Sequence, residues 1–95
     1  MKQVWIVWGS SGEYDDYSEW VVAVYTTQAE AEKHRVAAAL WITDHATEVR
    51  DLPWQEWCLL KNPYDSESGI QNLRANVHYA VGTSYEVLKK FVPVA

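Results

Sequence analysis

The sequence predicts a small α+β domain: a three-stranded antiparallel sheet in the order 2-1-3, one long helix packed on one face, and a short second helix. Two stretches rich in β-branched and aromatic residues, 4–8 and 20–25, are separated by a polar loop, which is typical of paired strands. A run of strong helix formers follows them, and a third apolar stretch closes the chain. At 95 residues the chain has the length of a single domain, 1–95.

The first two strands are expected at residues 3–8 and 19–26. Residues 3–8 are apolar on both alternating faces, so this strand is predicted to be central, with other elements packed on both sides. A polar loop of about ten residues is expected between the strands, longer than the commonest hairpin turns. Gly9 and Gly12 allow the backbone to bend there.

The long helix is predicted to begin after Thr27 and to run to about Glu48. Thr27 is a good N-cap, and Glu30, three residues later, completes the form of a capping box. Neither Gly nor Pro interrupts the residues that follow. Two neighbouring stripes are expected to form one broad apolar face against the sheet: Val36, Leu40 and Thr43, with Ala38, Trp41 and His45.

The segment after the long helix is predicted to hold one further helix and a loop. Pro53 ends or restarts the helix, because proline is accepted in a first helical turn and not in the interior. Residues 54–61 carry large side chains at the spacing of a short second helix. Residues 62–69 are rich in chain breakers and predict a loop, whereas residues 70–81 fit no single element.

The chain is expected to close with a strand at residues 85–94. Apolar side chains occupy both alternating faces of this stretch. Lys89 and Lys90 lie between them and suit an edge strand, because charges on an edge oppose pairing with another chain.

The net charge of −5 belongs to the first third of the chain. No Lys or Arg lies between Lys2 and Lys33, whereas six acidic residues do: Glu13, Asp15, Asp16, Glu19, Glu30 and Glu32. Nucleic acids and anionic membranes bind clustered basic residues, so neither is expected as a direct ligand. The lone Cys58 excludes an internal disulfide and favours a cytoplasmic setting, with no signal peptide and no membrane span expected.

The chemistry-bearing residues match no known catalytic or metal-binding spacing. His34 and His45 would lie about 16 Å apart along the helix axis, too far to share a metal ion. Cys58 and His78 alone do not make a zinc site. Residues 9–12 contain two glycines around two serines, but a nucleophile elbow leads directly into a helix and a phosphate loop needs a lysine. We therefore expect no catalytic residues, no metal and no cofactor.

Several short motifs resemble a group of small, uncharacterised proteins common in phages and prophages. The matching stretches, about half the chain, are Gly12-Glu13-Tyr14, Ala23-Val24-Tyr25-Thr26-Thr27, Ala29-Glu30-Ala31-Glu32 and Gly82-Thr83-Ser84-Tyr85-Glu86-Val87. The resemblance implies a β-β-α-β architecture and a mobile-element origin, and it transfers no catalytic residue. Residues 54–60 depart from the pattern of the group.

The candidate partner-binding surface is the first hairpin, where acidic and aromatic residues interleave: Glu13, Tyr14, Asp15, Asp16, Tyr17, Glu19 and Trp20. Interface centres favour Tyr and Trp, and charge steers the encounter with an opposite patch. With the resemblance, this predicts a non-enzymatic inhibitor of a host defence protein with a basic surface, acting in the host cytoplasm. Three alternatives stay open: a solvated hairpin tip, a small-ligand protein or enzyme with a pocket between the helix and Trp54/Trp57, and a homodimer.

Overall fold

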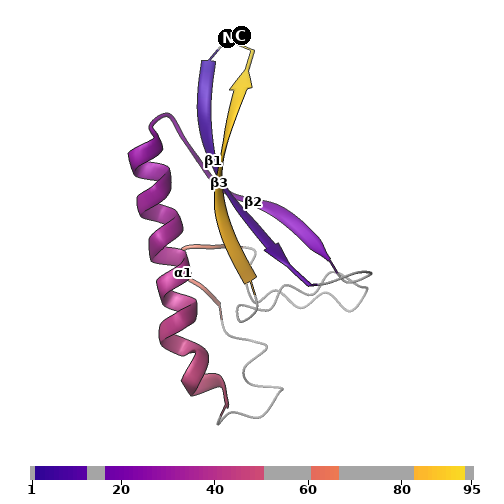
Figure 1. The fold of residues 1–95 in the computed structure, drawn as a ribbon, viewed down its shortest axis with the longest axis vertical. Helices are drawn as coiled ribbons and strands as arrows, with labels where there is room; N and C mark the ends of the chain where they lie inside the picture. Colours follow the sequence, from indigo (N-terminus) through magenta and orange to yellow (C-terminus); the bar gives the residue numbers. More distant parts are fainter. Residues whose placement is uncertain (1, 13–16, 51–60, 67–82, 94–95) are drawn as a thin grey trace.

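The computed structural model describes residues 2–12, 17–50, 61–66 and 83–93. Three strands and one helix follow one another along the chain: β1 (Lys2–Ser11), β2 (Ser18–Tyr25), α1 (Gln28–Arg50) and β3 (Thr83–Val92) (Figure 1). The strands form one antiparallel sheet in the order β2-β1-β3, which confirms the predicted class and strand order. The short second helix predicted at 54–61 and the unassigned stretch 70–81 fall outside the described residues, except for Lys61.

In the first hairpin, β1 is longer and the connecting loop shorter than predicted, whereas β2 has the predicted length, shifted by one residue. β1 continues past Trp8 to Ser11, which pairs with Ser18 at the start of β2. Gly9 lies within this extension and pairs with Trp20, and a Cβ at Gly9 would come within 2.7 Å of the indole ring. Glycine is therefore required inside this strand by the close approach of an aromatic ring.

Strand register divides the side chains of the sheet between two faces. β1 pairs with β3 without interruption, whereas its pairing with β2 shifts between Val7 and Trp8, so Val22 is the extra residue of a bulge. Trp20, Tyr25 and Tyr85 share one face by this register, and their side chains bond to α1 or to the segment after it. We call this the helix face.

The packing of α1 corrects half of the predicted apolar stripe. Ala31 and Ala38 are fully buried, whereas Val36, Leu40 and Thr43, expected against the sheet, are exposed. The three large rings of the helix face bond elsewhere: Tyr25 to His34 of α1, and Trp20 and Tyr85 to Asp65 in the turn after it. The side of α1 that is buried therefore differs from the one that hydrophobicity along the helix predicts.

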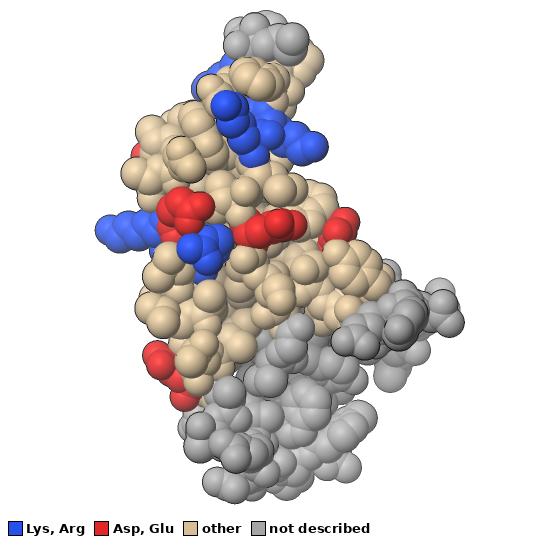
Figure 2. Space-filling model, in the orientation of Figure 1, with Lys and Arg blue, Asp and Glu red and all other residues tan. Residues whose placement is uncertain are grey.

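One end of the sheet extends beyond the helix. Figure 1 shows β1 and β3 continuing past the first turn of α1 to the end where both chain termini lie. Lys2, Lys89 and Lys90 are exposed in this paired end of β1 and β3, and Figure 2 shows basic side chains gathered there. β3 is an edge strand, as its adjacent lysines predict.

Candidate functional site

A buried turn connects the helix to the sheet and holds the candidate pocket in place. Asn62 is buried, and its side-chain amide donates to the carbonyl of Ala38 at 2.9 Å and to the hydroxyl of Tyr85 at 3.3 Å. Its side-chain oxygen accepts from the backbone N–H of Tyr64, and its carbonyl accepts from the N–H of Asp65, both at 3.0 Å. This side chain therefore fixes both the local turn and its distance from α1.

The carboxylate of Asp65 links the same turn to the sheet. Asp65 is 2% exposed, and both of its oxygens lie 3.1 Å from the indole nitrogen of Trp20. One of them also accepts from the hydroxyl of Tyr85 at 2.8 Å. Trp20 and Tyr85 flank Gly9 from opposite strands, so one carboxylate ties both edge strands to the turn. Hydrogen bonds to a charged acceptor are the stronger kind, and burial strengthens them further.

The turn presents Tyr64 to His34 on the helix. The Nε2 atom of His34 lies 2.6 Å from the carbonyl oxygen of Tyr64, and Nδ1 lies 2.7 Å from the hydroxyl of Tyr25. A carbonyl oxygen only accepts, so Nε2 carries the proton and donates it. In the neutral ring Nδ1 then accepts from Tyr25. His34 thus connects the end of β2 to the turn, with both ring nitrogens engaged.

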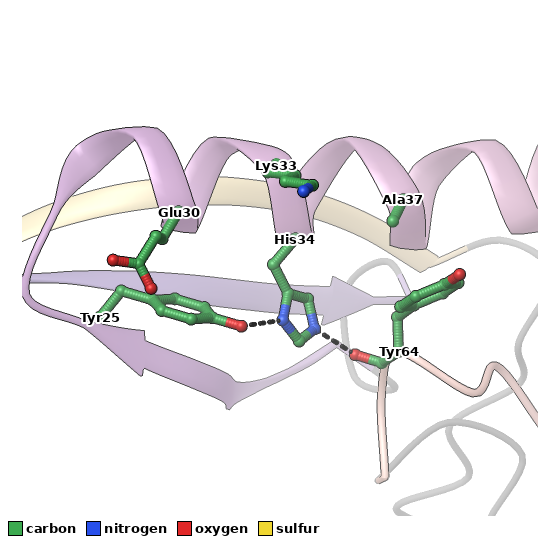
Figure 3. A pocket seen from close by; sticks show the side chains of 6 residues that line it. All are labelled: Tyr25, Glu30, Lys33, His34, Ala37 and Tyr64. Carbon is green, nitrogen blue, oxygen red and sulfur yellow. Dashed lines mark hydrogen bonds between the residues drawn. The ribbon is translucent and has the colours of Figure 1, made fainter.

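An open pocket of about 460 Å³ lies beside this chain of hydrogen bonds (Figure 3). It is lined by Tyr25, Glu30, Lys33, His34, Ala37 and Tyr64. The rings of Tyr25 and Tyr64 flank the imidazole, with ring centres 5.7 and 6.1 Å from it. Glu30 and Lys33 place one charge of each sign at the rim, and Ala37 leaves space that a larger side chain would fill. The arrangement suits binding of a small, flat ligand with a charged group.

A second candidate surface lies on the face of the sheet away from α1. By strand register this open face carries Val4, Ile6, Trp8, Ser10, Glu19, Val21, Val24, Ser84, Glu86, Leu88 and Val92, together with Lys2 and Lys90. Val4, which pairs with Lys90, is buried. Val21 and Val24 are 48% and 54% exposed. The open face therefore presents an apolar centre within the described sheet, unlike a solvated sheet face, which is normally polar.

Tyr17 lies at the acidic end of the open face. It is 51% exposed, and its hydroxyl donates to Glu19 at 2.5 Å. The pKa of Tyr17 is raised from its usual value, chiefly by this hydrogen bond, with smaller contributions from desolvation and from the negative charges of Glu19 and Glu86. A phenol held against a carboxylate favours its neutral form, because the phenolate would lose the bond and be repelled.

The predicted partner-binding residues fall into three groups. Tyr17 and Glu19 are exposed side by side, as a docking surface requires. Trp20 is buried on the helix face beneath Asp65, so its side chain belongs to the fold rather than to the exposed surface. The remaining four, Glu13, Tyr14, Asp15 and Asp16, lie outside the described residues, as do Trp54 and Trp57 of the alternative pocket.

The histidines of the helix occupy separate environments. His34 faces Tyr25 and Tyr64, whereas His45 stacks on Trp41 with ring centres 4.1 Å apart and bonds to the Trp41 carbonyl. Across residues 2–12, 17–50, 61–66 and 83–93, no three His, Cys, Asp or Glu side chains gather as a metal site would need. Cys58 and His78 lie outside these ranges.

The sequence did not point to Asn62, Tyr64 or Asp65, although Tyr64 lines the pocket and the other two hold its turn against the helix and the sheet. An Asn-Pro start to a polar stretch predicts a turn. Nothing in that pattern shows that the turn is buried or that it reaches Trp20, 45 residues earlier.

Within the described part of the chain, no helix has the length and apolarity needed to cross a membrane. Comparison of the chain with family models, with curated proteins and with solved structures finds no match in any of the three.

Proposed function

We infer that the chain is a non-enzymatic protein-interaction module that docks on a basic surface of a host protein. The observation that supports this best is the pair Tyr17 and Glu19, exposed and bonded to each other beside Glu86 and Val21. An exposed ring held by a carboxylate loses little side-chain freedom on binding, which favours affinity. Three further acidic residues, Glu13, Asp15 and Asp16, with Tyr14 among them, precede this pair in the sequence.

The sequence resemblance narrows the kind of partner. A phage-type protein acting in the host cytoplasm fits the role of inhibitor of a host defence protein, and a protein that itself binds nucleic acid would carry the basic surface required. Electrostatic complementarity of this kind mainly raises the association rate and depends on salt.

The test captures the partner from host lysate, identifies it by mass spectrometry, and measures association and dissociation rates with purified proteins. Replacing Asp15, Asp16 and Glu19 by their amides should slow association and flatten its salt dependence. Asp44→Asn removes one negative charge at an exposed position on α1 and is the control for Glu19→Gln. It should change neither the association rate nor its salt dependence.

Tyr17→Ala should act mainly on the dissociation rate. If Tyr17 is a central contact, dissociation should become roughly 30-fold faster, equal to about 2 kcal/mol. Tyr64→Ala removes a ring of similar exposure from the opposite side of the sheet and should leave the rate unchanged. Equal effects of the two alanine substitutions would argue against docking through Tyr17.

The expectation that the chain has no catalytic residue has its own test. We expect single alanine substitutions of His34, His45, His78 and Cys58 to leave partner binding and biological activity intact. His34→Ala should lower thermal stability, because it removes the link between Tyr25 and Tyr64. Loss of activity in a variant that keeps its fold would instead support a catalytic or metal-binding role.

The pocket beside His34 supports a second candidate function, binding of a small, flat, charged ligand. This site lies along the first half of α1. A ligand should raise the melting temperature of the wild type and lose that effect in Ala37→Leu, which fills the pocket. Ala39→Leu, on the same helix but outside the pocket lining, should retain the effect.

A further inference from the structure

The open face has the composition of a surface that is covered in solution. Its centre consists of Trp8, Val21 and Val24 with Ile6 and Leu88 beside them. Exposed antiparallel sheets normally place polar residues outward, whereas an apolar centre with a polar rim is typical of a protein interface. Val21 and Val24 are exposed, and Ile6, Trp8 and Leu88 are half-buried, so part of this apolar centre remains open to a partner.

The two ends of the open face carry opposite charges. Glu19 and Glu86 are exposed at one end, in register with Ser10 and Trp8 of the central strand. Lys2 and Lys90 are exposed at the other end, where Lys90 pairs with Val4. From Lys2 to Ser10 the extended strand advances by eight residue steps, a distance of about 26 Å. The face is therefore dipolar along the strand direction.

A surface with this pattern is complementary to itself in one orientation. A two-fold axis in the interface plane, perpendicular to the strands, brings the acidic end of one copy onto the basic end of the other and stacks the apolar centres. A two-fold axis along the strands would instead set like charges together. In a two-fold interface each contact occurs twice, so both pairs of ends are matched at once.

We propose that the open face pairs with the open face of a second copy, with strand directions opposed. Glu19 and Glu86 of each copy then meet Lys2 and Lys90 of the other, around a centre formed by Trp8, Val21 and Val24. Twisted sheets pack face to face within about 30° of alignment, which this arrangement allows.

The size of the face sets the strength of the dimer. Three strands about 4.8 Å apart and about 26 Å long cover roughly 400 Å² on each copy, or about 800 Å² in total. This lies below the standard size of a stable interface and in the range of weak, reversible complexes. The dimer should therefore form reversibly, in a concentration-dependent manner.

The inference goes beyond the proposed docking function and is tested without any partner. Sedimentation velocity on the purified full chain, across about 1 µM to 1 mM, should show a monomer–dimer equilibrium. Val24→Glu should weaken it at least tenfold. Leu40→Glu introduces the same charge at an equally exposed apolar position on α1 and should leave it unchanged.

Charge reversal tests the orientation. The double variant Lys2→Glu/Lys90→Glu and the double variant Glu19→Lys/Glu86→Lys should each weaken self-association. Combining all four substitutions in one chain keeps the wild-type net charge and exchanges the two ends, so it should restore the dimer.

Three results would overturn the proposal. The first is a wild-type chain that stays monomeric up to 1 mM. If Val24→Glu then abolishes the binding of a host protein, the open face binds that protein and not a second copy. The second is equal weakening by Val24→Glu and Leu40→Glu. The third is a variant with all four substitutions that does not recover self-association although its melting temperature matches that of the wild type.

Discussion

Asp65 shows how much of this fold depends on one residue without a sequence signal. Its carboxylate accepts hydrogen bonds from Trp20 of β2 and Tyr85 of β3, although it lies in a turn between α1 and β3. The sequence places Asp65 among polar residues that suggest a solvated loop. Burial of a carboxylate is costly unless donors surround it, so the indole and phenol donors explain its position. They also explain why Trp20 is a structural residue.

Replacing Asp65 by asparagine should destabilise the protein by about 2 kcal/mol, because the new amide N–H₂ group opposes donors where the carboxylate accepted them. The check is the free energy of unfolding from urea titration followed by tryptophan fluorescence. Asp44→Asn makes the same chemical change at an exposed position on α1 and should cost less than about 0.5 kcal/mol. Equal costs in the two variants would mean that the Asp65 network does not stabilise the fold.

Tyr17 should titrate at a higher pH than an ordinary tyrosine, since its hydroxyl donates to Glu19. Its raised pKa means that the folded state holds the phenol proton more tightly than the unfolded state. The associated stabilisation is complete below the ordinary tyrosine pKa and is lost as pH rises through the raised value. Glu19→Gln should move the pKa back down, as measured by NMR of ¹³C-labelled tyrosine rings, with Tyr17→Phe identifying the signal. No movement would mean that the bond is not formed in solution.

At the scale of elements, local signals in the sequence predict where α1 begins and fail to predict which side it buries. The N-cap at Thr27 is present: its hydroxyl oxygen lies 3.4 Å from the backbone nitrogen of Glu30 and 2.9 Å from the Glu30 carboxylate. Val36 and Leu40 nevertheless face solvent. Capping depends on neighbouring residues alone, whereas the buried side depends on how the helix lies against the sheet, which brings together residues far apart in the sequence. Sequence periodicity carries the first kind of information and not the second.

Thr27→Ala should lower stability by about 1 kcal/mol, because it removes an acceptor for an amide at the helix start. In a domain of this size the melting temperature should fall by about 5 °C. Thr27→Ser keeps the hydroxyl and is the matched control, so it should restore most of the loss. A melting temperature that is unchanged in Thr27→Ala would contradict a stabilising cap.

At the scale of the whole molecule, the class and strand order were predictable because alternation and capping are local, and only a few topologies join these elements without crossing. The pocket and the open face were not predictable, because each brings together residues that are far apart in the sequence. Glu19 and Lys90 share a face only through their pairing with β1, and Tyr64 meets His34 only through the buried turn. The same register gives the molecule two chemically different sides, and it places Glu19 on the side that the proposed docking and the proposed self-pairing both use.

Docking and self-pairing should therefore compete. In the proposed dimer, Lys2 and Lys90 of the second copy cover Glu19, the residue that docking needs exposed. The association rate with the captured host protein, expressed per chain, should fall as the chain concentration rises through the range in which dimers form. Lys2→Glu/Lys90→Glu keeps the acidic end and opposes self-pairing, so its rate per chain should stay constant over the same range. Stopped-flow measurements with both chains at matched concentrations provide the comparison. A wild-type rate per chain that stays constant while sedimentation shows dimers would mean that the two surfaces are separate.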